Sequence, residues 1–405
     1  MTAWKIYVRD LNYKRIGEVS DFQKLEAILK FNDVGTWILD INQASREALM
    51  LTVPGHGIQI INDDTGDQLM SGPVAGRHFA SKDGKETITV SGVDDNYWLK
   101  ARLSHPSPAE SFPPYEVQAN HAVTGQCSTV LRTYVSANLG TAANSERKIA
   151  NVTLPTDPLL GATVKGSVRW TNLLEDLQEL ATVGRNNSGD IGFRLTQVGT
   201  NLEFQVYQTS DKTTTAKFSR ELGNLAGYEF DTTAPETTYV YVAGQGEGTA
   251  RTIKEGQNSG ERLTWGRREE FADRRDTNDD TELGQKVTEV LEEHHEKTGL
   301  VIHPIDTEQL RFGVDYGMGD KVSVAVFETL KEQLPDAVAK QIRVSANFEG
   351  AVVKDVIRQV KVTLTPEKSR VEPVVGTENA EHPDAMRLAR EFRRLRMRTL
   401  NMETI

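Results

Sequence analysis

The sequence predicts an α+β fold that is mainly β, with two β-rich regions on either side of a mixed α/β region. Apolar and polar residues alternate with a period of two from Trp4 to about Leu103, and similar alternation returns beyond residue 236. Between them, a proline-rich stretch at 104–117 precedes segments whose apolar residues have helical spacing. A chain of 405 residues is long enough for two or three domains.

The first β region, 1–103, is expected to consist of antiparallel hairpins. The alternating segments 25–31 and 37–41 flank a turn that contains Asn, Asp and Gly, which is typical of a hairpin. A second hairpin is predicted at 57–74, and a third strand at 86–90 follows it.

The middle region, 104–235, is expected to contain both helices and strands. Helical spacing of apolar residues predicts helices within 124–138 and 173–181. The segment 191–208 alternates around Gly199 and predicts another hairpin. The proline-rich stretch that opens this region is a plausible domain edge.

The second β region, 236–366, contains further strands and one predicted helix at 282–297, whose apolar residues share one side. The segment that follows, 367–383, is polar and contains prolines, which is typical of a linker. The last predicted element is 384–401, where apolar residues stand among six arginines and two acidic residues. This pattern predicts an amphipathic helix, so that 367–405 consists of a linker and a C-terminal helix.

Charge and cysteine content argue against several classes of function. The chain has 47 Lys and Arg against 58 Asp and Glu, a net charge of −11, which disfavours a surface that grips DNA phosphates or anionic lipids. Cys127 is the only cysteine, so an intrachain disulfide and a Cys-rich zinc site are impossible. The sequence has neither a run of eighteen apolar residues nor an apolar export signal, and predicts no membrane segment.

Three motifs imitate reactive sites without the context that such sites need. Gly244–Arg251 follows a strand as a nucleotide loop would, but the next residues contain two glycines and predict no helix to face a phosphate. Asp64-Thr65-Gly66 matches the aspartic protease triplet, whose chemistry needs two such carboxylates, and is explained by a hairpin turn. His294 and His295 are adjacent on a predicted helix and cannot face one metal ion. We therefore predict no catalytic, cofactor-binding or metal-binding residues.

Four blocks of the sequence carry a resemblance to a known family. They are YVRDLNYKRIGEVSDFQKLEAILKFNDVGTWILDI (7–41), KFSRELGNLAGYEF running into TYVYVAGQGEGTAR (217–251), WGRREEFADRRD (265–276) and FGVDYGMGDKVSV (312–324). In order and spacing they resemble the siphophage tail hub family, the minor tail or baseplate hub proteins at the tail tip of phages that infect mainly Gram-positive hosts. The resemblance covers roughly Trp4 to Pro366, and the C-terminal helix lies outside it.

The resemblance implies an architecture and a set of partners. It implies two tail-tube-like β-barrel domains, 1–103 and 236–366, separated by an α/β insertion, 104–235, which could return a strand to the first barrel. Three copies would present six barrels, so that a homotrimeric ring closes the sixfold tail tube at the tip of the virion after assembly in the host cytoplasm. The implied partners are a distal tail protein or the tail tube above, fibre, spike or receptor-binding proteins below, and a tape measure protein. DNA would pass without specific binding, and an acidic chain suits that role.

The block 265–276 mixes arginines, carboxylates and aromatic residues. Such a set could form a bidentate ion-pair network between subunits, but a solvated loop leading into a helix explains the sequence equally well. The resemblance favours the interface. The candidate subunit-interface residues are Arg251, Trp265, Arg267, Arg268, Glu269, Asp273 and Arg274.

The predicted C-terminal helix has three interpretations: a nucleic-acid contact, a membrane contact or a contact with a protein partner. The first two would normally bring more lysine and a cleaner apolar face, so partner binding or trimerisation is favoured. Its candidate partner-binding residues are Met386, Leu388, Phe392 and Leu395.

Two other functions remain open from the sequence. A tail-associated cell-wall hydrolase would need a zinc motif, a Cys-His pair or paired carboxylates at a cleft, and no such pattern stands out. A carbohydrate-binding adsorption protein would place recognition in the insertion, where the aromatic candidates are Trp170, Tyr207 and Tyr228.

Overall fold

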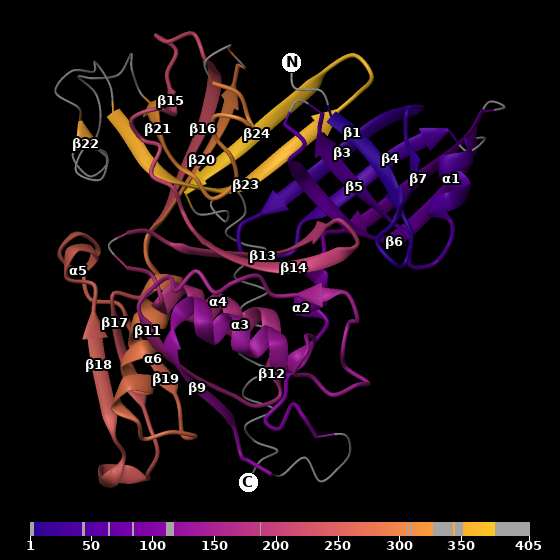
Figure 1. Cartoon of the computed structure of the whole chain (residues 1–405). Coiled ribbons are helices and arrows are strands. Elements are labelled where there is room, and N and C mark those ends of the chain that lie inside the picture. The colour runs from indigo at the N-terminus through magenta and orange to yellow at the C-terminus, as the bar shows by residue number, and fades with distance from the viewer. Residues whose placement is uncertain are drawn as a thin grey trace.

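The structure of the protein is a computed structural model that describes residues 4–42, 45–63, 65–82, 85–110, 117–186, 188–305, 307, 310–326, 343–344 and 351–376. It is mainly β, as predicted, and its β-rich half lies above a half in which helices pack on small sheets (Figure 1). The predicted C-terminal helix, 384–401, lies outside the described residues. None of the helices in the described part is long and apolar enough to cross a bilayer.

The first β region forms the hairpins that the sequence predicts. Ala27 pairs with Trp37 between β3 and β4, and Ile60 pairs with Met70 between β5 and β6. The predicted third strand is β7. The elements are β1 (Trp4–Arg9), β2 (Arg15–Glu18), β3 (Phe22–Lys30), β4 (Thr36–Asn42), α1 (Arg46–Leu51), β5 (Gly57–Asn62), β6 (Gln68–Lys82) and β7 (Lys85–Val93).

The next part of the chain packs helices against small sheets, with its own apolar core. The predicted helix at 173–181 is α4, which begins where Asn172 accepts hydrogen bonds from two backbone N–H groups of its first turn. The predicted helix at 124–138 begins only at Cys127, because the preceding residues pair with another strand. The elements are α2 (Tyr97–Lys100), β8 (Leu103–Ser104), β9 (His121–Gln126), α3 (Cys127–Asn138), β10 (Val152–Thr153), β11 (Thr163–Val168), β12 (Thr171–Asn172), α4 (Leu173–Val183), β13 (Ile191–Val198) and β14 (Asn201–Gln208).

The remaining elements differ from the predicted boundaries in two places. Strands β15 and β16, expected in the insertion, pair with strands of the second β region. Part of the predicted linker is strand β24, because Val371 and Val375 pack with the core after a tight turn at Thr365–Lys368. The elements are β15 (Lys217–Phe218), β16 (Leu225–Thr233), β17 (Tyr239–Ala243), the 3-10 turn η1 (Gly248–Ala250), β18 (Ile253–Gln257), α5 (Ser259–Trp265), β19 (Glu269–Asp273), α6 (Asp280–Glu293), β20 (Lys297–Pro304), β21 (Lys321–Val326), β22 (Arg343–Val344), β23 (Ala351–Leu364) and β24 (Ser369–Gly376).

The two β regions share one sheet and one core. Their junction is the antiparallel pair β23–β3, in which Val360 faces Leu29. One buried apolar cluster includes Trp37 from the first region and Phe218 and Val362 from the second. Within the described residues, the sheet path runs β16-β20-β24-β23-β3-β4-β7-β6-β5-β1-β2 and remains open at both ends.

A buried ion pair fastens the first β region to the α/β part. The guanidinium of Arg9 donates two hydrogen bonds to Asp95, at 2.5 and 2.8 Å, and a third to Gln197 of β13, at 2.9 Å. Ser71 of β6 also donates to Asp95. Both charged side chains are almost completely shielded from solvent, and the hydrogen bond from Arg9 to Gln197 ties β13 to the β-rich half.

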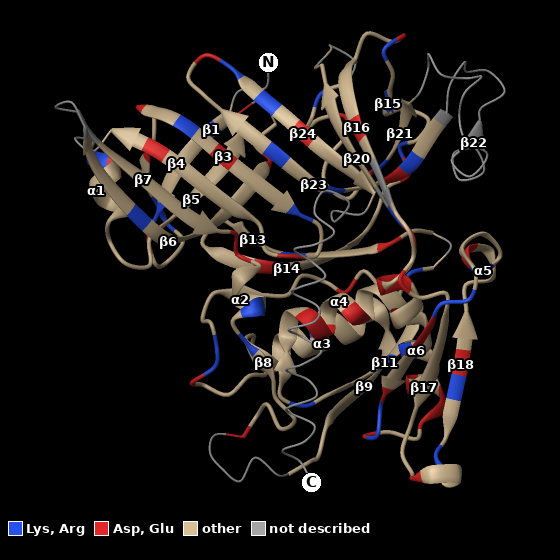
Figure 2. Cartoon of the chain, turned by 180° about the vertical axis from the view of Figure 1, so that it is seen from behind, with Lys and Arg blue, Asp and Glu red and all other residues tan. Residues whose placement is uncertain are grey.

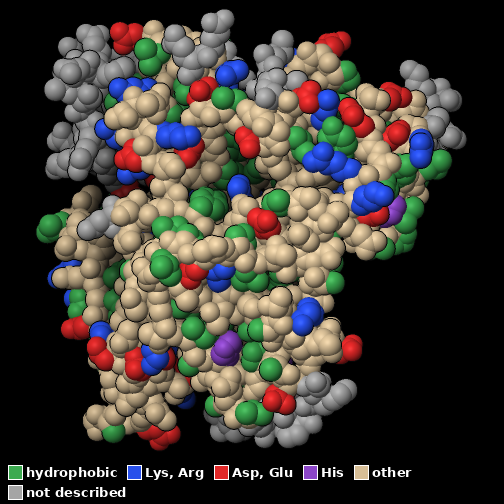
Figure 3. Space-filling model, in the orientation of Figure 1, with side chains coloured by type: hydrophobic (Ala, Val, Ile, Leu, Met, Phe, Trp, Pro, Cys, Tyr) green, Lys and Arg blue, Asp and Glu red, His purple; other side chains and the backbone are tan. Residues whose placement is uncertain are grey.

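The segment between β16 and β20 forms a separate unit, residues 236–296, which we call the small module. Its sheet has the order β18-β17-β19, and α6 covers one face of it. The inner residues Val240 and Val242 pack on Leu283 and Val290 of α6. The predicted helix at 282–297 is confirmed as α6, which begins earlier because Asp279 caps its first turn. Basic and acidic residues are interspersed along the described strands and helices (Figure 2), and their side chains are scattered over the face in Figure 3.

Candidate functional site

The face of the small module's sheet that points away from α6 brings together most of the predicted interface residues. Because strand side chains alternate, the burial of Val240 and Val242 against α6 places Tyr239 and Tyr241 on the opposite side. The strand register adds residues of β18 and β19 to that side. We call this surface the outer face; its strand residues are Tyr239, Tyr241, Ile253, Glu255, Gln257, Glu269, Phe271 and Asp273.

Arg267 lies flat on the outer face and links two strands. Its guanidinium carbon is 3.6 Å from the centre of the Tyr239 ring, its Nε donates to Glu269 at 2.5 Å, and its Nη2 donates to the Tyr241 hydroxyl at 2.6 Å. The hydrogen bond to Glu269 raises the pKa of Arg267, and a hydrogen bond with Glu255 raises the pKa of Tyr239. The arginine is thus held in one orientation by an aromatic ring and a carboxylate.

Arg251 forms a second arginine–aromatic pair on the same face. Its guanidinium carbon is 5.6 Å from the Phe271 ring centre, and it donates hydrogen bonds to the carbonyls of Gly244 and Ala243 and to Asp273. Large apolar side chains of this face nevertheless remain open: the exposed fraction is 58% for Phe271 and 50% for Ile253. Arginine and aromatic residues are enriched at protein interfaces, and here carboxylates hold the arginines in place.

The other predicted interface residues lie elsewhere in the small module. Arg268 stands over Trp265 at 5.8 Å and donates to the carbonyl of Pro235, while the indole of Trp265 donates to Glu296 at 3.0 Å. Arg268 and Trp265 thus stabilise the end of the module where it joins β16 and β20. Arg274 points to the opposite side, into a small cavity between the module and α4.

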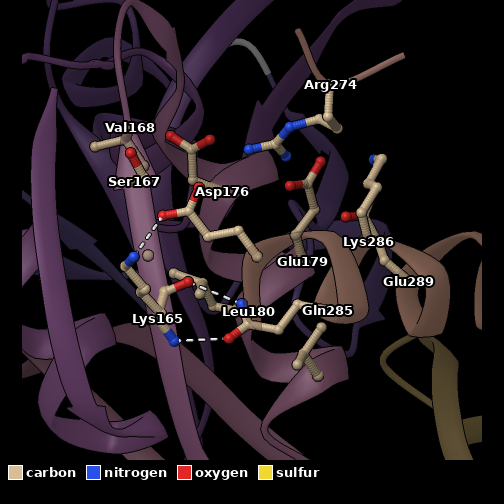
Figure 4. A pocket seen from close by; sticks show the side chains of 13 residues that line it. Lys165, Ser167, Val168, Asp176, Glu179, Leu180, Arg274, Gln285, Lys286 and Glu289 are labelled. Carbon is tan, nitrogen blue, oxygen red and sulfur yellow. Dashed lines mark hydrogen bonds and ion pairs between the residues drawn. The ribbon is translucent and has the colours of Figure 1, made fainter. Parts of the chain in front are cut away.

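The cavity has a volume of about 60 Å³ and is lined by charged side chains from both α4 and α6 (Figure 4). The guanidinium of Arg274 lies between the carboxylates of Asp176 and Glu179, and Lys286 and Glu289 of α6 stand beside them. Burial raises the pKa of Asp176 to about 6, although hydrogen bonds from Ser104 and Thr171 oppose the shift. Burial of its carboxyl group, and then the nearby carboxylate of Glu289, raise the pKa of Glu179, although the residue as a whole remains exposed to solvent.

The motifs that imitate reactive sites have structural roles where the structure describes them. Gly244–Arg251 leads through the short 3-10 turn η1 into strand β18, so no helix end faces a phosphate there. Gly66 donates its N–H to the carbonyl of Asn62 in the predicted hairpin turn. His294 contacts Glu270 at 2.5 Å, whereas His295 turns to the carbonyl of Glu292. Among the described residues there is no cluster of three or more His, Cys, Asp or Glu side chains that could hold a metal ion.

Comparison with known proteins identifies the family of the chain. The model of the family described as Siphovirus ReqiPepy6 Gp37-like protein matches residues 5–377. The chain belongs to this family. The match covers all four sequence blocks and confirms the predicted resemblance to siphophage tail proteins. No curated protein matches the chain by sequence.

Solved structures share the fold at low sequence identity. The tail protein from Neisseria meningitidis MC58 is 13% identical with a TM-score of 0.54, and the alignment covers 95% of this chain and 99% of that chain. The prophage tail protein gp18 from Listeria monocytogenes EGD-e is 12% identical with a TM-score of 0.53, covering 95% and 98%. The 43 kDa tail protein of prophage MuSo2 from Shewanella oneidensis is 10% identical with a TM-score of 0.53, covering 92% and 98%. The whole described architecture is therefore that of a phage tail protein fold.

Sequence reasoning missed the aromatic part of the outer face and the cavity. The alternation in TTYVYVAG places Tyr239 and Tyr241 on one side of a strand and could have identified the face once its buried side was known. In LLEDLQEL the spacing of Asp176 and Glu179 puts both carboxylates on one side of a helix. No local pattern predicts that Arg274 lies beside this helix, because it is nearly one hundred residues further along the chain.

Proposed function

We propose that the protein is a structural hub at the tip of a long-tailed phage tail, where three copies form a ring that closes the tail tube and anchors host-recognition proteins. The observation that carries the proposal is the match of nearly the whole chain to a siphovirus family, together with a fold shared with tail proteins. In this role the virion tail is its location, and its neighbours are a distal tail protein or the tube above and fibre, spike or receptor-binding proteins below.

The two joined β regions support ring formation. Although they share one open sheet, each would take the place of one tube subunit, so three copies supply six such units to meet a sixfold tube. The open ends of the sheet path, β2 and β16, have unpaired edges among the described strands, and such edges favour pairing with another chain. A ring of identical subunits gives both edges a neighbour.

The outer face of the small module is the contact that we assign to a neighbouring subunit. Arg267 and Arg251 are already ordered by their aromatic and carboxylate neighbours, so little side-chain entropy is lost when a protein surface covers them. The stacked Arg267 occupies one ring face of Tyr239, which a sugar would otherwise use. This arrangement favours a protein contact over a carbohydrate site.

The charged cavity gives little support to a cell-wall hydrolase. It contains paired carboxylates, but a volume of about 60 Å³ has no room for a sugar ring, and Arg274 stands between Asp176 and Glu179. A structural role without turnover accounts for these charges better than catalysis does.

The oligomeric state tests this proposal. We expect the purified protein to form trimers at high concentration in sedimentation or light-scattering measurements. Arg267→Ala should weaken the trimer by roughly thirtyfold, since arginine anchors that a partner surface covers carry much of the binding energy of an interface. The matched control is Arg275→Ala, because Arg275 is 70% exposed at the side chain and, within the described part of the chain, its ion pair is with Asp273. A monomer at all concentrations, or equal effects of both variants, would contradict the assignment.

A further inference from the structure

The small module has its own core and is separate from the rest of the protein in its sheet pairing. Its buried apolar residues form a cluster distinct from the two larger cores, and its three strands pair only with one another among the described strands. An element with its own core can move as a unit, since motion need not disturb that core.

The module is attached to the β-rich half at one place. The last residue of β16, Thr233, pairs directly with the first residue of β20, Lys297, so the chain leaves and returns at neighbouring positions. Next to this junction, the N–H of Glu236 donates to the carbonyl of His294 at 2.9 Å. Two adjacent chain segments that enter a unit side by side form a hinge rather than a broad joint.

Polar contacts hold the module against the neighbouring α/β part. Lys165 of β11 pairs with Asp279 at 2.8 Å and Glu282 at 3.1 Å, and Arg185 pairs with Glu292 at 2.6 Å. The side-chain amide of Gln285 both accepts from the N–H and donates to the carbonyl of Lys165, at 2.8 Å each. It therefore takes the place of a neighbouring strand at the edge of β11 that β9 does not occupy. We call these contacts the seam.

The seam encloses an excess of acidic groups. The cavity is lined by the carboxylates of Asp176, Glu179, Glu282 and Glu289 against the cations Lys165, Arg274 and Lys286. Its apolar lining residues Val168, Leu180 and Val183 pack with the core of the α/β part and not with that of the small module. Separation of the two parts would therefore expose charged groups that water solvates well, and little apolar surface.

We propose that the small module swings as a rigid body about the junction of β16 and β20, and that the seam is the lock that holds it closed. The swing would change the orientation of the outer face relative to the β-rich half. Salt should favour opening, because the ion pairs of the seam are partly exposed and are screened by ions.

The pH dependence follows from the carboxyl groups in the cavity. Glu179 faces Glu289 and Lys286 of α6, Arg274, and Asp176 of its own helix, and its pKa is raised in the closed state. The pKa of Asp176, about 6, is raised as well. A group with a higher pKa in the closed state takes up a proton on closure, so closure should strengthen as the pH falls from about 8 to 5 and weaken as it rises.

Distance measurements between two spin labels test the swing. Cys127 is buried and burial raises the pKa of its thiol to about 12, so labels would attach at Leu263→Cys and Val198→Cys, which replace side chains that are 88% and 44% exposed. Labelled full-length protein, diluted with unlabelled protein, should show one distance. Lys165→Ala with Gln285→Ala should add a second distance, and its share should grow with salt and with pH between 5 and 8.

Lys254→Ala is the matched control. Lys254 pairs with Asp280 at 2.7 Å at the start of α6, but this ion pair lies wholly within the module. Lys254→Ala should therefore leave the single distance between the two labels unchanged. Hydrogen exchange in the seam variant should accelerate about tenfold or more in β11, where the hydrogen bond to Gln285 is lost, while β17 keeps its protection. An unchanged single distance in the seam variant, or loss of protection in β17, would overturn rigid-body opening.

Discussion

Asp95→Ala should destabilise the protein by about 3–5 kcal/mol, because it leaves the guanidinium of Arg9 buried without its carboxylate. Arg9 is 2% exposed and Asp95 is fully buried, so water cannot replace the lost partner. The hydroxyl of Ser71 would also lose its acceptor. Chemical denaturation of the full chain, compared by its midpoint and slope with the wild type, measures this loss.

The matched control for this prediction is an ion pair of the same type at the surface. Lys5 and Asp63 are 2.9 Å apart with side chains that are 40% and 44% exposed. Asp63→Ala should cost less than about 1 kcal/mol, since exposed ion pairs contribute little. Arg9→Ala combined with Asp95→Ala should cost less than the sum of the two single changes, because neither charge is then left unpaired. Equal effects at the two sites would show that burial does not determine the strength of the Arg9–Asp95 contact.

Much of the local structure could be predicted from the sequence, because it depends on neighbouring residues. The hairpins of β3–β4 and β5–β6 have alternating strands around polar turns, and α4 has a capping Asn172 before its apolar spacing. The start of α3 was predicted three residues too early because 121–126 pairs with β11, a strand about forty residues away. Strand β24 was missed for a similar reason: its valines are buried only because β23 and β20 lie beside it.

The candidate site, like the fold, could be predicted only in part from the sequence. Charge density in WGRREEFADRRD identified Arg267, Glu269 and Asp273, which do gather on the outer face with Arg251. The same density gave no means of separating Arg274, which faces the cavity instead. The side on which a strand residue lies is fixed by what covers the other side, and here that is α6. The junction of β23 with β3 joins residues more than three hundred positions apart, which no local pattern encodes.

Trp37→Ala should destabilise the protein by about 3–5 kcal/mol, the usual cost of removing a buried indole. Trp37 is 1% exposed, and its indole N–H donates to the carbonyl of Val93 at 3.2 Å. Its ring lies directly on the backbone of Gly92, where an added Cβ would be 2.2 Å from it. Collapse of the backbone into the space is opposed by the β4–β7 pairing, so a cavity should remain.

The effect of Trp37→Ala should reach both β regions, because β4 pairs with β3, which pairs with β23 of the second region, and one core runs beneath all three strands. Hydrogen exchange should therefore accelerate in β23 as well as in β7, and denaturation should remain a single transition for the β-rich half. Ile38→Ala is the control: it changes the next residue on the same strand, which is 43% exposed on the other side of the sheet, and should cost under about 1 kcal/mol. If β23 kept its full protection in the Trp37 variant, the two β regions would be independent domains, and the shared core would not couple them as the sheet pairing indicates.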